Sequence, residues 1–265
     1  MHSKPIPCGR RRILVSNVDA TTFRKKRYNK SKIALAQTLL HFAHQAHIDL
    51  ICLPSGYLIT PNKSDIISLT KPILRLAKQY NIAITLGIDL TEITTFPDDP
   101  NSTRMLKAVT SGMMPCFMAT YHTSLQKTIL TNQRSCTPYQ STQRLAPDHI
   151  MQPRTISLNG IAFQLIQCGE IYSNVLFNES APKAGVVCGH WSMPRLSRTL
   201  AVKGALGYSL INSEHRSGEN GLHFCNDRGQ NKSVYNCRHF EEGHIWANAA
   251  VWELTEKGRI NKGTL

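Results

Sequence analysis

The sequence predicts an α/β fold in which helices cover the faces of layered sheets. Short apolar runs rich in β-forming residues alternate along the chain with segments of helical spacing. Extra pairs of strand-like runs, joined by turn residues, are inserted between these units. The chain has 265 residues, 41% of them hydrophobic, so it is long enough to bury one large core or at most two.

The first third of the chain shows the alternation most clearly. Its predicted strands are residues 12–17, 49–53 and 82–88, and its predicted helices are residues 33–46 and 66–80. In the first helix, Ala36 and Leu40 fall on one face. The second strand ends at Pro54-Ser55-Gly56, a sequence typical of a turn.

The middle of the chain is less regular. Residues 91–103 are polar and predict a surface loop, and residues 105–110 and 113–120 predict two strands joined at Ser111-Gly112. Residues 121–152 have little periodicity and contain Lys127. We expect a long ordered loop there. Loops of that length are usually either functional or disordered.

The second half returns to strand signals. Residues 155–158 and 161–167 flank Asn159-Gly160, the strongest short signal for a β-hairpin. A short helix after residue 168 and a helix at 194–206 are expected. Further strands are predicted at residues 184–188, 208–212, 222–225, 233–240 and 245–253.

Cys168 stands where the strand 161–167 ends and a helix-like segment begins, next to Gly169. The N–H groups of a helix's first turn lower a thiol's pKa and stabilise a developing oxyanion, so this is a suitable place for a nucleophile. The alternative is a small buried residue in the core, since free cysteines are among the most buried residue types.

The chain is basic, with 31 Lys and Arg against 17 Asp and Glu and a formal net charge of +14. Residues 24–32 hold the densest charge run. It is suited either to phosphate contacts or, as we favour, to a solvated loop and helix start. No apolar run reaches membrane-spanning length and the N-terminus lacks the apolar core of a signal peptide. We therefore expect a cytoplasmic protein with reduced cysteines and no membrane partner.

Two pairs of metal-ligand residues flank a polar turn near the C-terminus. If their strands form a hairpin, His223 faces His239 and Cys225 faces Cys237, a plausible zinc set. Ligands on adjacent strands form a flat square that suits a tetrahedral metal poorly, so we favour ordinary packing. No cofactor is expected.

Three segments, in this chain order, resemble the nitrilase, or carbon–nitrogen hydrolase, superfamily. They are residues 49–58, which contain Pro54-Ser55, residues 125–130, which contain Lys127, and residues 167–170, which contain Cys168-Gly169-Glu170. The resemblance covers residues 12–255 and leaves basic residues 1–11 and residues 256–265 as tails. It implies a nitrilase-like four-layer α-β-β-α sandwich, a homodimer, and a Glu–Lys–Cys triad. In that triad Cys168 is the nucleophile and Lys127 the lysine.

The sequence departs from the family at Ser55. The family has its general-base glutamate at this position, and a serine hydroxyl is not a base near neutral pH. Loss of a general base alone costs about 10²–10⁴-fold in rate. A neutral Lys127, or Glu170 two residues after the nucleophile, is the other candidate base.

Three functions remain open at this point. The first is a divergent hydrolase that acts on a small amide or nitrile through Cys168, weakened by loss of the base. The second is an inactive nitrilase-like binding or regulatory protein. The third is a basic protein associated with nucleic acid, which is not favoured. The substrate does not follow from the sequence, because variable loops shape the pocket in such folds.

Overall fold

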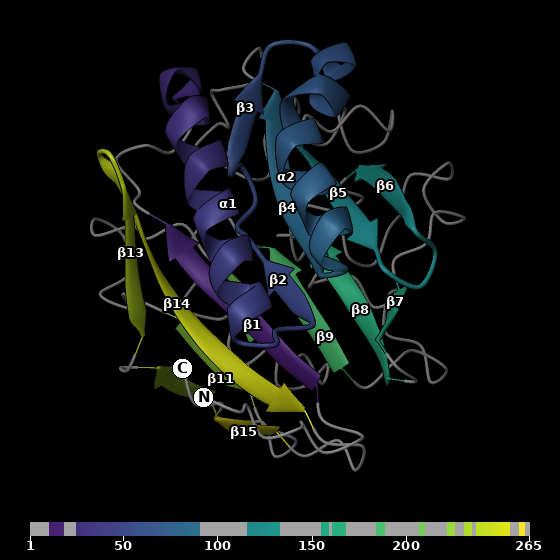
Figure 1. Ribbon diagram of the computed structural model, residues 1–265, viewed down its shortest axis with the longest axis vertical. Helices are drawn as coiled ribbons and strands as arrows, with labels where there is room; N and C mark the ends of the chain where they lie inside the picture. Colours follow the sequence, from purple (N-terminus) through teal and green to yellow (C-terminus); the bar gives the residue numbers. More distant parts are fainter. Residues whose placement is uncertain are drawn as a thin grey trace, which may run out of the picture.

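The computed structural model describes two β-sheets and two α-helices (Figure 1). The described residues are 11–18, 25–90, 116–132, 155–158, 161–167, 184–188, 207–209, 222–225, 231–234, 237–254 and 260–262.

The larger sheet has β1 and β2 near its centre. Its strands run in the order β13 (Arg238–Glu242), β14 (Ile245–Leu254), β1 (Arg11–Val18), β2 (Leu50–Cys52), β4 (Ala83–Leu90), β5 (Cys116–His122) and β6 (Lys127–Asn132). Two further strands pair outside this path, β3 (Leu58–Thr60) with β4 and β15 (Ile260–Lys262) with β14. β1, β2 and β4 are parallel, whereas β14 and β5 pair antiparallel with β1 and β4.

The second sheet packs face to face against the first. Its order is β12 (Asn231–Val234), β11 (Leu222–Cys225), β10 (Gly207–Ser209), β9 (Ala184–Cys188), β8 (Ile161–Gln167) and β7 (Thr155–Leu158). One apolar cluster joins the sheets, with Ile13, Leu50 and Met118 from the first and Ile156 and Leu165 from the second. Burial of such side chains stabilises the sandwich by roughly 25 cal/mol per Å² of apolar area.

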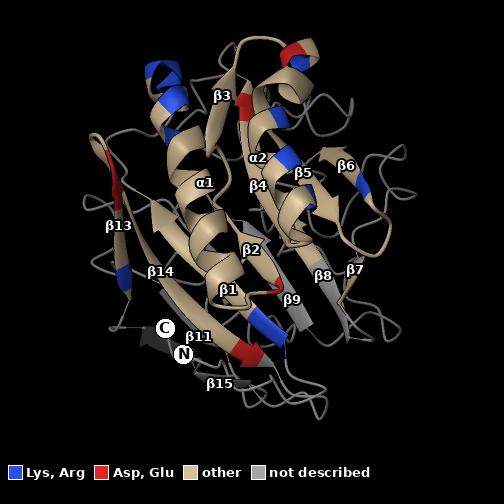
Figure 2. Cartoon of the chain, viewed as in Figure 1, with Lys and Arg blue, Asp and Glu red and all other residues tan. Residues whose placement is uncertain are grey.

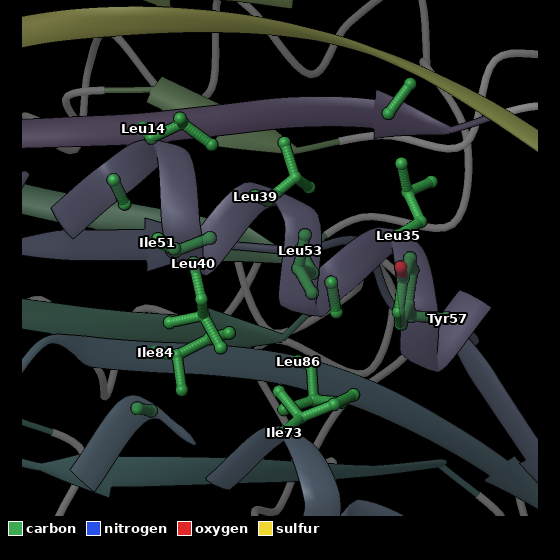
Figure 3. Close-up of a cluster of buried hydrophobic side chains, with 14 of the residues drawn as sticks. Leu14, Leu35, Leu39, Leu40, Ile51, Leu53, Tyr57, Ile73, Ile84 and Leu86 are labelled. Carbon is green, nitrogen blue, oxygen red and sulfur yellow. The ribbon is translucent and has the colours of Figure 1, made fainter. Parts of the chain in front are cut away.

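Helices α1 (Asn29–Gln45) and α2 (Ile66–Tyr80) cover the outer face of the larger sheet (Figure 1). Leu35 and Leu39 of α1 and Ile73 of α2 point into a core shared with strand residues such as Ile84 and Leu86 (Figure 3). The described residues therefore form three layers, helix on sheet on sheet. The predicted helix at 194–206 lies outside them.

Most predicted strands and the second helix are confirmed. The bounds of α2, β9 and β11 coincide with the predicted ranges, and β7 and β8 form the predicted hairpin with Leu158 opposite Ile161. α1 begins at Asn29, four residues before the predicted start, because its first turn is polar and lacks an apolar periodicity. The predicted strand 105–110 and the turn Ser111-Gly112 lie outside the described residues.

The expected long loop at 121–152 is wrong in its first part. β5 continues to His122, and β6 pairs antiparallel with it from Lys127 to Asn132. The turn between them is closed by Gln126 in a left-handed conformation (φ +51°), whose side chain accepts a hydrogen bond from the Tyr121 hydroxyl over 2.9 Å. Thr and Ile residues in β6 favour a strand, but the polar sequence of the turn conceals the hairpin.

Across the described ranges, the structure contains no helix with the length and apolar character needed to span a membrane.

Candidate active site

The central feature of the candidate site is a large bulge between β2 and β3. Both strands pair with β4: Cys52 lies opposite Thr85, and Leu58 lies opposite Ile88. Five residues, 53–57, therefore span the length that two residues cover on β4. Bulges of this kind bend a strand and re-aim its side chains, often beside active sites. Ser55 lies in the middle of this one.

Specific contacts hold the bulge in place. The backbone N–H of Leu53 donates to the Thr85 carbonyl over 2.9 Å, and the N–H of Gly87 donates to the Pro54 carbonyl over 3.1 Å. Gly56 takes φ +64°, a left-handed conformation that glycine adopts at little cost. The bulge is thus fixed to β4 by main-chain hydrogen bonds, which gives Ser55 a defined position.

Tyr57 anchors the other end of the bulge. Its side chain is buried between α1 and the sheet (Figure 3), and its hydroxyl donates to the Lys32 carbonyl over 2.5 Å. β3 then resumes under Asn29, whose side chain accepts from the Ile59 N–H over 3.1 Å and donates to the Ile59 carbonyl over 2.6 Å. Helix α1 therefore fixes the chain that follows Ser55.

Gly87 permits the bulge to lie directly on β4. A Cβ atom added at this position would lie 2.3 Å from the Ser55 Cα, 2.8 Å from the Gly56 nitrogen and 2.9 Å from the Pro54 oxygen. These are backbone atoms and cannot rotate away. Since side chains alternate along a strand, residues 83, 85, 87 and 89 share one face of β4, and Ala83 packs in the cluster between the sheets. Ser55 therefore lies on the face of β4 that is directed toward the second sheet.

Replacing Gly87 by Ala should destabilise the protein, by about 1–3 kcal/mol or more, because the new methyl group displaces the bulge backbone. Urea unfolding measures this change in the free energy of unfolding. Gly243→Ala is the control: Gly243 has a positive φ of +64°, so alanine strains the backbone there, but its added Cβ meets nothing closer than 4.0 Å. A Gly87→Ala variant no less stable than Gly243→Ala would contradict the close approach.

The Ser55 side chain is fully buried at 0% exposure, and its Oγ has no hydrogen-bond partner among the residues that the structure describes. An unsatisfied buried hydroxyl costs about 1–3 kcal/mol, so native proteins seldom keep one without a role. A serine hydroxyl can donate or accept one more hydrogen bond. The site thus offers a polar group to a ligand at the position where the resembled family has a carboxylate.

The second sheet brings the end of β8 to the same edge. Arg11, at the start of β1, donates from Nε to the Leu158 carbonyl over 2.9 Å, and Leu158 pairs with Ile161, the first residue of β8. β8 therefore begins at the edge where β1 and the parallel β2 and β4 begin, and Gln167 ends it toward the edge of Ser55. Gln167 is fully buried. Cys168 follows it in the sequence, and both Cys168 and Glu170 lie outside the described residues.

Lys127 lies near the end of the sheet opposite to Ser55, measured along the strands. This corrects the expectation that Lys127 meets Ser55. It is the first residue of β6, pairs with His122 and is exposed. The other end of β6, Asn132, pairs with Phe117 at the level of Ile88 and hence of the bulge. Lys127 and Asn132 are five residue steps apart along the strand, a distance of about 17 Å.

His122 is a buried imidazole at the Lys127 edge. It is 1% exposed, and neither ring nitrogen has a hydrogen-bond partner among the described residues. Burial lowers the pKa of His122 because the charged form loses its hydration, and the positive charge of Lys127 lowers it further. The fold therefore favours the neutral form of the ring.

The protein should lose stability through His122 as the pH falls below about 6.5. In that range the His122 imidazole binds a proton more readily in the unfolded chain than in the folded protein, so protonation favours unfolding. Urea unfolding of wild type and His122→Gln at pH 8 and pH 5 checks this: the loss should be smaller in the variant. His239→Gln is the control of opposite sign, because the bond to Glu241 raises the pKa of His239. Equal losses in wild type and His122→Gln would contradict the assignment.

The zinc set considered from the sequence does not form. β11 pairs with β12, which places Cys225 opposite Asn231 and His223 opposite Ser233 in the second sheet. His239 instead pairs with Asn248 in the larger sheet. The chain changes sheets between β12 and β13, so the two ligand pairs do not face each other, and no cluster of three metal-ligating side chains occurs in the described part of the chain.

The basic run at 24–32 is divided by the start of α1. Lys25, Lys26 and Lys30 are exposed, whereas Lys32 is buried at 2% exposure on the inner side of the helix. The Lys and Arg positions of α2 lie apart from those at the start of α1 (Figure 2). The described residues thus do not form one continuous phosphate-binding surface that includes Lys32.

No protein-family model matches the sequence, and no curated protein matches it. Solved structures do match the fold. An amidase from Nesterenkonia sp. superposes with a TM-score of 0.55 at 12% identity, covering 95% of this chain and 92% of that one. A Glu-to-Gln variant of the Nesterenkonia sp. AN1 enzyme, with the acetamide moiety of fluoroacetamide on its active-site cysteine, gives 0.55 at 12%, covering 97% and 95%.

A third match is the cysteine-to-alanine variant of the same amidase in complex with butyramide, with a TM-score of 0.52 at 11% identity and 93% of each chain covered. This amidase is described as a member of the nitrilase superfamily. At such low identity the similarity is one of fold. The chain therefore has the nitrilase fold, as the resemblance of its sequence implied.

Proposed function

We propose that the protein is a carbon–nitrogen hydrolase of the nitrilase superfamily that cleaves a small amide through a thioester on Cys168. The observation that carries the proposal is that the bulge with Ser55 and the end of β8, which Cys168 follows in the sequence, lie at the same end of the sandwich. The fold of an amidase over more than nine-tenths of the chain supports it.

The chemistry needs a thiolate, a proton acceptor and a site for the oxyanion. The Cys168 thiolate attacks the amide carbon, the amine leaves, and water hydrolyses the thioester to the acid. The buried Ser55 hydroxyl is suited to hydrogen-bond the substrate rather than to take a proton. Glu170 remains a candidate in the proposal, and Lys127 is no longer one because of its place in β6.

Short-chain amides are the substrates to try first. The similar amidase binds acrylamide and butyramide in its cysteine-to-alanine variants, so this size of ligand is a reasonable guide. Release of ammonia from acetamide, propionamide and butyramide, and from the matching nitriles, tests the proposal. Ammonia release above that of a Cys168→Ala control supports it, and equal rates in the two proteins overturn it.

The second candidate is an inactive protein of the same fold that binds a small amide. The replacement of the family glutamate by Ser55, with a buried and unpartnered hydroxyl, is the observation that favours it. Saturable butyramide binding without ammonia release would select this alternative. The homodimer expected from the resemblance also stays a prediction, and sedimentation at micromolar concentration tests it.

A further inference from the structure

Asp89 is a buried carboxylic acid in the last part of β4, next to the candidate site. It is 3% exposed and pairs with Ile59 of β3 on one side and Cys116 of β5 on the other. Aspartate is rarely buried this fully in a sheet, because its charge loses hydration there, and such acids are often functional.

The position of Asp89 relative to Ser55 follows from the contact at Gly87. Ser55 lies on the face of β4 to which a Gly87 side chain would point, and residues 87 and 89 share that face. Two residues along a strand span about 6.7 Å. The Asp89 side chain therefore lies on the same face of β4 as Ser55, two residues beyond Gly87 toward the end of the strand.

We propose that Asp89 is the general base of the site and replaces, from the neighbouring strand, the glutamate that the family carries at position 55. The proposal rests on the proposed hydrolase function. It accounts for how a chain with Ser55 at this position retains a proton acceptor. It also gives Gly87 a second role, because any larger residue there would stand between the bulge and Asp89.

The proton then follows a balanced route. Asp89 takes the proton of the Cys168 thiol as the sulfur forms its bond to the amide carbon. It returns that proton to the nitrogen when the carbon–nitrogen bond breaks and the amine leaves. In the second half, Asp89 takes a proton from the attacking water, the carbon–sulfur bond breaks, and the proton goes back to the Cys168 sulfur.

The charged and titratable groups near Asp89 bear on its protonation. Cys116 lies opposite it on β5, and the Lys63 ammonium lies 5.4 Å from the ring of Phe117 at the same end of the sheet. Phe117 is directed to the helix-covered face, so Lys63 lies across the sheet from Asp89. Asp65, from the same segment as Lys63, accepts a hydrogen bond from the Thr60 hydroxyl over 3.4 Å, and Thr60 pairs with Leu90 next to Asp89. The described titratable groups at this end of β4 thus include Cys116, Lys63 and Asp65.

The test compares kcat/KM for ammonia release in Asp89→Asn, Asp89→Glu and wild type between pH 5 and pH 9. Asp89→Asn should lose about 10²–10⁴-fold, because the amide keeps the shape but cannot accept the proton. Asp89→Glu should retain the acid limb of the pH profile, and Asp89→Asn should lose that limb. If Asp89 had only a structural role, Asp89→Asn would lower kcat/KM without removing the acid limb of the pH profile.

Asp49→Asn is the matched control. Asp49 is a partly buried acid at the opposite edge, where burial raises its pKa and the Arg12 N–H donates to its Oδ2 over 2.7 Å. Its variant should stay within about threefold of wild type. Cys168-dependent turnover that Asp89→Asn leaves within threefold overturns the assignment of Asp89 alone. Turnover that survives Cys168→Ala, or no turnover in wild type, removes the proposed function and this inference with it.

Discussion

Replacing Cys168 by Ala should abolish amide hydrolysis, with a loss of at least about 10⁴-fold in kcat. No other side chain in the account forms the covalent intermediate, so the loss should exceed that of any other variant. The fold should be unaffected, because the replaced group is small. Ammonia release in the variant and in wild type, at matched protein concentration, measures the effect.

Cys237→Ala is the control for this variant. Cys237 is partly buried in a segment that packs against the cluster between the sheets. It takes no part in the proposed chemistry, so its variant should keep wild-type activity. In the unaltered protein, iodoacetamide should label Cys168 before the other seven thiols, since a nucleophilic thiolate reacts fastest. Equal labelling of several cysteines would argue against an activated nucleophile.

Ser55→Glu should have little effect in wild type and a large effect in the Asp89→Asn background. In wild type the new carboxylate joins Asp89 in one buried site, where two like charges raise a pKa and add no new base. We expect a change of less than about tenfold there. In Asp89→Asn the same substitution supplies the missing base and should raise kcat/KM by about 10²–10⁴-fold.

Ser55→Gln in both backgrounds separates the charge from the size of the new side chain. Position 55 is fully buried, so any larger residue strains the bulge. Only Ser55→Glu should restore activity to Asp89→Asn. A gain of 10² or more from Ser55→Glu in wild type would mean that no base operates there, which is the inactive-protein alternative.

The parts of the fold that the sequence predicts well are those with a strong period. The stripe of buried residues on α2, with Ile66, Ile73 and Ala77, has helical spacing and gave both helix ends correctly. The hairpin of β7 and β8 followed from Asn159-Gly160, a turn with a defined backbone requirement. β5 and β6 were harder, because the turn before Lys127 has no glycine or proline to mark it.

The candidate site was only partly predictable, for a geometric reason. Ser55 lies within the turn Pro54-Ser55-Gly56, and β8 ends shortly before Gly169. The sequence therefore places both at strand ends. Lys127 was misplaced because a lysine before an apolar pair is a weak motif, and its distance from the site depends on the pairing of β5 with β6. Asp89 was missed because it lies on the strand that neighbours the bulge, and its place on the Ser55 face depends on the close approach of Gly87 to Ser55.

Trapping the covalent intermediate tests most directly whether Cys168 is the nucleophile. Wild-type protein is mixed with the best amide substrate, quenched in acid before one turnover is complete, digested and weighed by mass spectrometry. We expect the acyl mass on the peptide that contains Cys168. Substrate consumed with no adduct at Cys168, or an adduct on another cysteine, would contradict it.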